Sequence, residues 1–437
     1  MTFPNGTQTT YSYDPASQVT QILHQIVSSA TQINQAAYAY NPVGNRTSLT
    51  DRRGAQTFGY DNLDRLTSAS HPLMATPQTF AYDPVGNRTT GGSVVNAGNQ
   101  LTADATHAFQ YDDNGNLTRK TLLATGNYSQ YTYDAENRLT KVEEFAVGNP
   151  IPAATSTYRY DGLGRRIEKV ANGQTRRYVY DNEDILLEYD ETNTLLARYT
   201  HGPGFDEPIA MTRGGSTFFY HQDGLASVTE LTDSAGATAR SYAYDVWGNL
   251  LDQTGTVENP YTYTGREQDT GSGLYYYRAR SYDPTVGRFL LKDPAGLGKG
   301  TSAYLYVDGN PATLIDPDGL QAIPYPLPGP PLPFPLPPIA VPGSPENRQT
   351  AQATSEALQQ LRDAFQGQID KLRKWRWTCT AQCNVQSIGK GCCPDRVSGT
   401  ASGPSEEIPC REAKRAAVGS TPAGCYARHC KCLCQKN

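Results

Sequence analysis

Aromatic residues alternate with small or polar residues in short runs along most of the chain, as in Tyr38-Ala-Tyr40 and Phe80-Ala-Tyr82. Aromatic side chains at positions i and i+2 face the same side of an extended strand, so each run predicts a β-strand with one aromatic face. The segments that follow, Asn-Pro-Val-Gly-Asn and Asp-Pro-Val-Gly-Asn, contain the residues that favour tight turns. The pattern therefore predicts a series of β-hairpins.

The hairpin unit, Tyr-x-Tyr-Asp-x-x-Gly-Asn-Arg-x-Thr, recurs with steps of about 20 to 29 residues between the second aromatics. These second aromatics are Tyr13, Tyr40, Tyr60, Tyr82, Tyr111, Tyr133, Tyr160 and Tyr180. A single hairpin cannot bury its aromatic face, whereas stacked hairpins can. We therefore predict antiparallel strands over residues 10–320, with turns at Gly44-Asn45, Gly86-Asn87 and Gly115-Asn116. Residues that recur at every turn are interpreted as scaffold rather than as a sugar or nucleic-acid site.

From Tyr242 onward, the loose repeats change to a denser set of motifs. These are Tyr-Asp-Val-Trp-Gly-Asn from 244, Gly-Leu-Tyr-Tyr-Tyr-Arg-Ala-Arg-Ser-Tyr-Asp-Pro from 273, Gly-Arg-Phe-Leu-Leu-Lys-Asp-Pro from 287 and Asp-Pro-Asp-Gly-Leu at 316–320. Repeats and motifs together resemble the YD repeats and the Rhs-repeat-associated core of Rhs proteins and toxin-complex C subunits. The resemblance implies an all-β fold, in which an antiparallel YD-repeat sheet spirals into a hollow shell around a C-terminal polypeptide. Complete shells of this family carry more repeats, so whether this shell is complete stays open at this point.

In the Rhs family the core is an aspartyl self-protease that cuts after the Leu of its terminal Asp-Pro-x-Gly-Leu motif. The resemblance places the cut at the Leu320–Gln321 bond and assigns the acidic residues to Asp293 and Asp316, with Arg288 as the basic residue beside them. Peptide hydrolysis needs a base to activate water and an acid to protonate the leaving nitrogen. Two close carboxyl groups can share one proton, because like charges do not both ionise cheaply.

Other aspartates near these motifs have a different interpretation. Asp14-Pro and Asp283-Pro are expected to be turn residues, and turn chemistry is also the alternative for the two candidate catalytic aspartates. Asp308 and Asp318 lie close enough in the sequence to be alternative catalytic residues.

Composition supports an all-β chain, because it has 29 Tyr, 40 Gly and 30 Pro but only 3 Met among its 437 residues. Charge is unevenly distributed along it. Residues 321–437 hold 14 Lys and Arg against 8 Asp and Glu, whereas the whole chain has a net charge of −5. The body is therefore acidic and the tail basic, which favours a phosphate-rich partner for the tail.

The composition changes abruptly after residue 320. About half of residues 323–342 are proline, which predicts an extended linker or threading segment that cannot join a sheet interior. Apolar residues at helical spacing then predict a helix over residues 344–377. We expect four parts: a YD-repeat shell at 1–240, the core at 241–320, the linker at 321–343 and a helical, Cys-rich domain at 344–437.

All nine cysteines lie between Cys379 and Cys434. So few apolar residues accompany them that disulfides or a metal ion must help to hold the tail together. Four disulfides and one free thiol is one solution, and a zinc site that includes His429 is another, although no Cys-x-x-Cys pair occurs. Disulfides are favoured for a domain that is secreted into an oxidising space. No other cofactor is expected.

By its position the tail matches the variable toxin tip of Rhs proteins. The resemblance implies a polymorphic toxin of interbacterial competition, with a cognate immunity protein and a secretion-system or shell-capping component as partners. The basic tail suits RNA or DNA as the target. His429 titrates near neutrality and could act as general base of an RNase-like site, or it could instead pack or bind metal. Acid partners for this histidine would be Glu406, Glu407 and Glu412.

Two functions therefore remain open from the sequence. The first is an effector whose shell encapsulates a toxin, expected to be a nuclease, and releases it by aspartyl autoproteolysis after Leu320. The second is a non-enzymatic cell-surface or structural protein whose Cys-rich tip binds a partner. The start of the chain shows no signal peptide, and no stretch of 18 apolar residues predicts a membrane span. We expect a delivered bacterial effector that is cytoplasmic before its export by another route.

Overall fold

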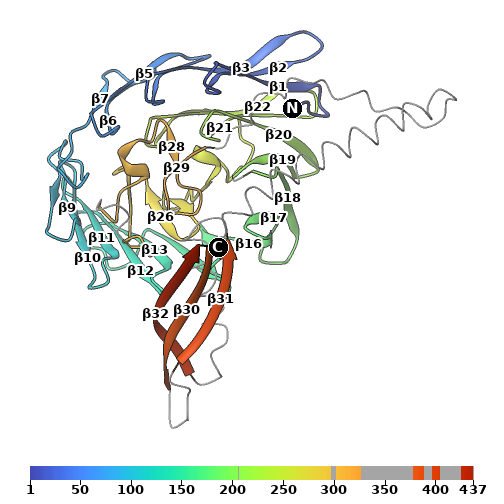
Figure 1. The fold of residues 1–437 in the computed structure, drawn as a ribbon. Coiled ribbons are helices and arrows are strands. Elements are labelled where there is room, and N and C mark those ends of the chain that lie inside the picture. The colour runs from blue at the N-terminus through green and yellow to red at the C-terminus, as the bar shows by residue number, and fades with distance from the viewer. Residues whose placement is uncertain (205, 297–301, 326–376, 388–395, 404–424, 437) are drawn as a thin grey trace. The chain divides into compact units, whose positions relative to one another are not determined.

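The structure is a computed structural model that describes residues 1–204, 206–296, 302–325, 377–387, 396–403 and 425–436. The chain divides into two compact units, Met1–Pro331 and Leu332–Asn437. In the first unit, antiparallel sheets form a curved wall, and shorter strands of the core motifs lie inside the curve (Figure 1). The predicted all-β fold is confirmed for this unit.

The wall consists of two sheets in which every strand pairs with its neighbours in the sequence. The seven-stranded sheet contains β1 (Thr7–Tyr13), β2 (Val19–Ile26), β3 (Thr31–Tyr40), β4 (Arg46–Asp51), β5 (Gly54–Tyr60), β6 (Leu66–Ser70) and β7 (Gln78–Thr79). The sixteen-stranded sheet contains β8 (Val94–Val95), β9 (Leu101–Ala103), β10 (His107–Tyr111), β11 (Leu117–Leu122), β12 (Tyr128–Tyr133), β13 (Leu139–Phe145), β14 (Ala154–Tyr160), β15 (Arg166–Ala171), β16 (Gln174–Asp181), β17 (Asp184–Tyr189), β18 (Leu195–His201), β19 (Pro208–Arg213), β20 (Ser216–Gln222), β21 (Val228–Thr232), β22 (Thr238–Tyr244) and β23 (Leu250–Thr254).

Each repeat turn is capped by its own aspartate or asparagine. Between β14 and β15, Asp161 Oδ1 accepts the backbone N–H groups of Leu163 (2.9 Å) and Arg165 (3.0 Å), and Gly164 takes the positive φ of 84° that glycine tolerates. The same pair of bonds recurs at Asp14, Asn41, Asp61, Asp83, Asn96, Asp134, Asp190, Asp223, Asp233 and Asp245. The predicted turns are confirmed, because Gly44, Gly86 and Gly115 all have positive φ.

The second tyrosine of the repeat joins one hairpin to the previous one. The Tyr133 hydroxyl donates to the backbone carbonyl of Leu117 (2.8 Å), the first residue after the preceding turn. The same bond recurs at Tyr40, Tyr60, Tyr82, Tyr160, Tyr180 and Tyr244. In the opposite direction, Arg65 Nη1 donates to Asp83 O in the following turn (2.9 Å). The repeated residues are therefore scaffold that fixes the stacking of the hairpins.

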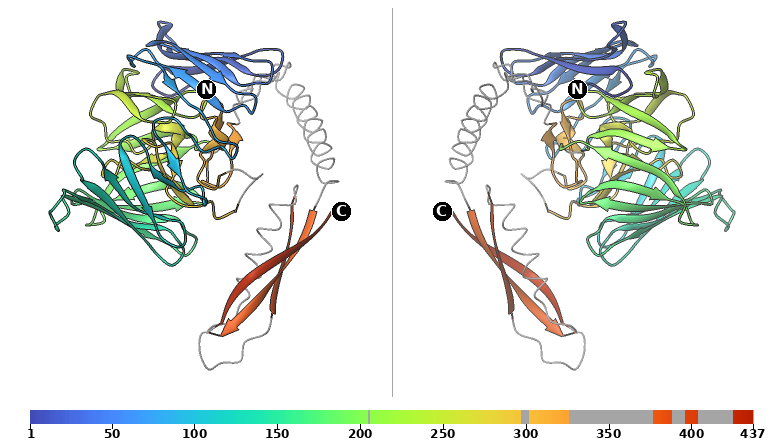
Figure 2. Two further views of the ribbon diagram at one scale, coloured as in Figure 1. Left: turned by 90° about the vertical axis from the view of Figure 1, so that its left-hand side faces the viewer. Right: turned by 90° about the vertical axis from the view of Figure 1, so that its right-hand side faces the viewer.

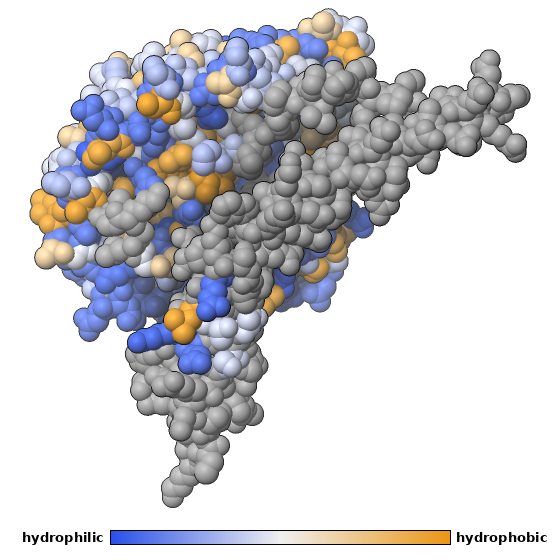
Figure 3. All heavy atoms as spheres, in the orientation of Figure 1, coloured by the Kyte–Doolittle hydropathy of each residue, from blue (hydrophilic) through white to orange (hydrophobic). Residues whose placement is uncertain are grey.

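The wall curls back on itself, since its first strands contact its last. Asn5 Nδ2 donates to Asp233 O (2.7 Å), and Asn34 Nδ2 donates to Glu230 Oε2 (3.0 Å). Figure 1 shows β1 near β20, β21 and β22, and the two side views of Figure 2 show the same curved wall. On the face drawn in Figure 3, apolar side chains of the wall are scattered among hydrophilic ones.

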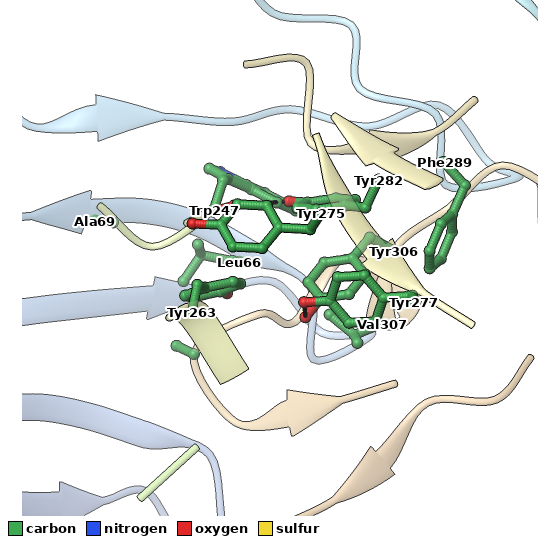
Figure 4. Close-up of a cluster of buried hydrophobic side chains, with 11 residues drawn as sticks. Leu66, Ala69, Trp247, Tyr263, Tyr275, Tyr277, Tyr282, Phe289, Tyr306 and Val307 are labelled. Carbon is green, nitrogen blue, oxygen red and sulfur yellow. Dashed lines mark hydrogen bonds between the residues drawn. The ribbon is translucent and has the colours of Figure 1, made fainter. Parts of the chain in front are cut away.

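The motifs after Tyr244 form the inner layer of the first unit. It contains a four-stranded sheet, two short 3-10 helices and a two-stranded sheet. Their bounds are η1 (Tyr263–Gly265), β24 (Glu267–Gln268), β25 (Tyr275–Tyr277), β26 (Arg280–Asp283), β27 (Arg288–Phe289), η2 (Val307–Gly309), β28 (Leu314–Ile315) and β29 (Ile323–Pro324). Inner-layer aromatic side chains pack against Leu66 and Ala69 of β6 (Figure 4). Burial of these rings fixes the inner strands to the wall.

The described part of the second unit is a three-stranded antiparallel sheet, ordered β31-β30-β32. Its strands are β30 (Trp377–Ser387), β31 (Arg396–Gly403) and β32 (Cys425–Lys436). The helix predicted over 344–377 lies outside the described residues, except for Trp377, which begins β30. Within the predicted linker, Ile323 and Pro324 form β29 of the two-stranded sheet, and residues 326–343 also lie outside the described residues. Within the described chain, we found no helix with the length and apolarity of a membrane span.

Candidate active site

A buried arginine joins the two aspartates that the motifs single out. Arg280 begins β26, and its Nη2 lies 3.1 Å from Asp293 Oδ2 and 3.1 Å from Asp316 Oδ2. The two carboxylate oxygens are therefore no further apart than twice that distance. The Asp316 side chain is 3% exposed and that of Asp293 is 14% exposed, so Asp293 has the better access to water.

The chain from Asp316 to Gln321, which we call the strap, folds over the Asp316 carboxylate. Asp316 Oδ1 accepts the backbone N–H groups of Leu320 and Gln321, both at 2.9 Å. The Gln321 nitrogen is the one that hydrolysis of the Leu320–Gln321 bond would release. Asp318 Oδ1 also accepts the Leu320 N–H, at 3.2 Å. Asp316 therefore contacts the predicted scissile peptide directly.

The tip of the β25–β26 hairpin holds the first half of the strap. Three consecutive strap carbonyls accept hydrogen bonds from the two residues of the tip and from the first residue of β26. The pairs are Arg278 Nη1 with Pro317 O, Ala279 N with Asp318 O (3.1 Å) and Arg280 Nε with Gly319 O. Gly319 has a φ of 71°, and a Cβ there would lie 2.4 Å from the Tyr277 carbonyl oxygen. The glycine of the motif is thus required by both conformation and space.

The residues after the predicted bond are held as well. Ile323 pairs with Ile315, and Pro324 pairs with Leu314, in the β28–β29 sheet. Ala322 packs against the inner aromatic cluster. Hydrogen bonds and packing therefore fix the chain on both sides of the Leu320–Gln321 bond.

Burial shifts the protonation of this group of residues. It raises the pKa of Asp316 to about 6, against the opposing effect of the Arg280 charge. The pKa of Asp293 is also raised, chiefly by burial, and burial lowers the pKa of Arg280 itself. Asp316 can therefore hold a proton close to pH 6, and acid–base catalysis by two carboxyls requires one of them to be protonated and the other ionised.

The structure differs from the sequence prediction in the basic residue. The resemblance assigned it to Arg288, but the side-chain hydrogen bonds of Arg288 go to Asn87 Oδ1 (3.2 Å) and Asn99 O (2.6 Å) in the wall and to Ser302 Oγ (3.3 Å), not to Asp293 or Asp316. Arg280 is the residue between the carboxylates. The sequence contains Arg280 in the Tyr-Arg-Ala-Arg run from 277. Without the strand pairing, that run does not show which of its two arginines lies beside the aspartates.

The other sequence candidates lie in different surroundings. Asp308 is exposed in η2, whereas Asp318 lies in the strap. Asp283 caps its own turn through Thr285 N (2.9 Å) and pairs with Lys120 Nζ (2.7 Å), as a turn residue would. His429 is part of β32, but its side chain lies outside the described residues.

The side chains of the remaining candidate functional residues of the tail also lie outside the part of the chain that the structure describes. The three glutamates proposed as acid partners lie outside the described residues, as do all cysteine side chains. The choice between disulfides and zinc therefore stays a prediction.

Comparison with known proteins gives the same picture for the first unit. A protein-family model described as Teneurin YD-shell matches residues 4–146 and 74–302. The tRNA3(Ser)-specific nuclease WapA of Bacillus spizizenii is 37% identical over 230 residues, which cover 51% of this chain and 9% of that protein. Double-stranded DNA deaminase toxin A of Burkholderia cenocepacia is 31% identical over 321 residues, covering 65% of this chain and 22% of that protein.

Solved structures agree on the fold. The crystal structure of TcdB2-TccC3-Cdc42 is similar with a TM-score of 0.60 and 23% sequence identity, and the match covers 72% of this chain and 18% of that one. The chain thus spans less than a quarter of the length of these relatives.

Proposed function

The chain belongs to the YD-shell family of Rhs-type repeat proteins, and we propose that it is an effector that releases a C-terminal toxin by cutting its own Leu320–Gln321 bond. One observation supports the self-cleavage most directly. Asp316 Oδ1 lies 2.9 Å from the Gln321 nitrogen, and Asp293 and Asp316 both pair with Arg280. The substrate is a segment that the fold itself holds in place, so the reaction needs no diffusional encounter.

The two carboxyl groups take different roles in this proposal. Asp293, which has the better access to water, removes a proton from a water molecule whose oxygen attacks the Leu320 carbonyl carbon. Asp316, protonated because of its raised pKa, donates its proton to the Gln321 nitrogen as the C–N bond breaks. The products are a carboxylate at Leu320 and an amine at Gln321. Arg280 keeps the two carboxyls together and limits their mutual repulsion.

Conservative variants test the assignment. Asp316→Asn and Asp293→Asn keep the size of each side chain but remove the acid or the base, so each should leave a single full-length band on a denaturing gel. Asp308→Asn is the matched control, because Asp308 is exposed in η2, and it should be cut as the wild type is. Normal cutting of both site variants would refute the assignment.

For the delivered part, we propose a toxin that degrades nucleic acid, with RNA slightly favoured over DNA. Support comes from relatives that are named as a tRNA nuclease and a DNA deaminase toxin, although the matches cover only part of those proteins. From Lys371 onward the tail has 12 Lys and Arg against 4 Asp and Glu, which attracts a phosphate backbone. His429 is the proposed acid–base group.

Expression of residues 321–437 in bacteria tests this second proposal. Growth should stop, and total RNA or DNA should be degraded, unless a cognate immunity protein is expressed as well. Intact nucleic acid in arrested cells would refute the nuclease and indicate a membrane or protein target. Delivery through a secretion system, with a shell-capping component as partner and a cytoplasmic location before export, belongs to the same proposal.

A further inference from the structure

Arg278 occupies a position at which its backbone conformation is unfavourable. It lies in the two-residue tip between β25 and β26 and has a φ of 50°, in the left-handed region. Such a conformation costs a non-glycine residue about 1–2 kcal/mol, and glycine would avoid that cost. Contacts of the arginine side chain must therefore offset this cost.

The contacts of the Arg278 side chain connect the wall to the strap. Its Nη1 donates to the carbonyl oxygen of Pro317, the residue next to Asp316. Its Nη2 lies 2.9 Å from Asp206 Oδ1 and 3.7 Å from Asp184 Oδ1, and its Nε lies 3.3 Å from Glu183 Oε2. These acids belong to the wall: Asp206 to the loop between β18 and β19, Glu183 to the loop between β16 and β17, and Asp184 to the start of β17.

Of these acidic partners, Asp206 is the one that orients the arginine. Its side chain is 2% exposed, whereas that of Glu183 is 59% exposed. Ion pairs exposed to water hold a side chain weakly, while a buried carboxylate strongly requires its cation. Arg266 also pairs with Asp206 and donates to the Tyr276 carbonyl in β25, which fixes the carboxylate in turn.

We propose that Arg278 and Asp206 form a positioning pair for the self-cleavage, which holds the Pro317 carbonyl so that the scissile peptide stays on Asp316. Neither residue contacts the Leu320–Gln321 peptide, so the effect is indirect. Fixing the Pro317 carbonyl fixes the Pro317–Asp318 peptide plane, and with it the path of the strap between Asp316 and the scissile peptide. The inference rests on the proposed function and deepens it, because it makes cleavage depend on correct folding of the wall around β18 and β19.

The discriminating variant is Arg278→Gly. Glycine relieves the backbone at this tip and Arg266 still pairs with Asp206, so the fold should tolerate the loss of this ion pair, whereas the hold on Pro317 is lost. We expect cleavage to slow by roughly tenfold to a hundredfold, the size of effect that a small misplacement of reacting groups produces. Arg278→Lys should recover part of the rate, because an ammonium group can still donate to the carbonyl. Asp206→Asn should also slow cleavage, because it removes the charge that orients Arg278.

The assay follows pulse-labelled full-length chain after cell-free synthesis and measures the rate at which the two fragments appear. The matched control is Asn172→Gly, which places glycine at another positive-φ residue (52°), in the turn between β15 and β16, and should leave the rate unchanged. Thermal unfolding checks that Arg278→Gly is folded at the temperature of the assay.

The outcomes separate the two proposals. Wild-type chain that is cut, together with an Arg278→Gly variant that is cut at the same rate, would overturn the positioning role and leave self-cleavage intact. A wild-type chain that is never cut would overturn both. Slow cutting of a stable Arg278→Gly variant, with partial rescue by Arg278→Lys, is the expected result.

Discussion

Replacement of Arg280 by methionine tests the electrostatic basis of the site. Methionine retains an unbranched, flexible chain but removes the charge and every hydrogen bond that the Arg280 side chain makes. In the native structure these bonds go to Asp293, Asp316 and the carbonyl oxygens of Ala303 and Gly319. Removal of one partner of a buried ion pair typically costs about 3–5 kcal/mol, because the remaining charge is left buried and unpaired.

The effect should depend on pH in a defined direction. Asp316 has a folded-state pKa of about 6, above its ordinary value, so the folded protein binds protons more readily than the unfolded chain between pH 4 and pH 6. Without the arginine this pKa rises further. The Arg280→Met variant should therefore lose most stability at pH 7 and recover part of it near pH 5, where Asp316 is protonated and needs no cation.

Two measurements check the Arg280 prediction. Urea unfolding at pH 5 and pH 7 gives the stability, and the fraction of cut chain on a gel gives the activity, which should fall to background at pH 7. Lys120→Met is the matched control, since it removes the partner of buried Asp283 far along the chain from the strap. It should destabilise the protein but leave cleavage in place. Cleavage of Arg280→Met at the wild-type rate would refute this account of the site.

Four further outcomes are expected. The cleavage rate should fall as the pH rises through about 6, because Asp316 then loses the proton that it donates, and a rate that is flat from pH 5 to pH 8 would contradict this role. Asp161→Ala removes the two backbone bonds that cap a repeat turn and should cost about 1–2 kcal/mol in urea unfolding. Gly115→Ala should cost at least 1 kcal/mol by the same assay, since φ is 87° and the new Cβ would lie 2.7 Å from the Tyr304 hydroxyl. His429→Ala in the expressed tail should abolish degradation of nucleic acid, and persistent degradation would remove this residue from the active site.

The hairpins could be predicted from the sequence because their determinants are local. Tyr-x-Tyr sets the face of a strand, and the Asp and Gly of the next few residues set the turn, so the positive φ at Gly44 follows from neighbours in the chain. The bond from Tyr133 to Leu117 could not be predicted in the same way. It depends on how one hairpin stacks on another.

The candidate site shows the same division. The resemblance identified Asp293 and Asp316, and the structure places both on one arginine. The resemblance named Arg288 as the basic residue, whereas the arginine between the two carboxylates is Arg280, because its place depends on the pairing of β25 with β26 and on the path of the strap. The buried contacts of Asp206 with Arg278 also join segments that are far apart in the sequence, and no local pattern indicates them.

The most direct test is to determine the mass and the N-terminal sequence of every species in freshly purified full-length protein. The account predicts two fragments, of which the smaller begins Gln321-Ala-Ile-Pro and contains about a quarter of the residues. It also predicts a single intact mass for Asp316→Asn. A wild-type chain with one intact mass, or a smaller fragment that begins at any other residue, would contradict the central claim that this strap is the substrate of its own fold.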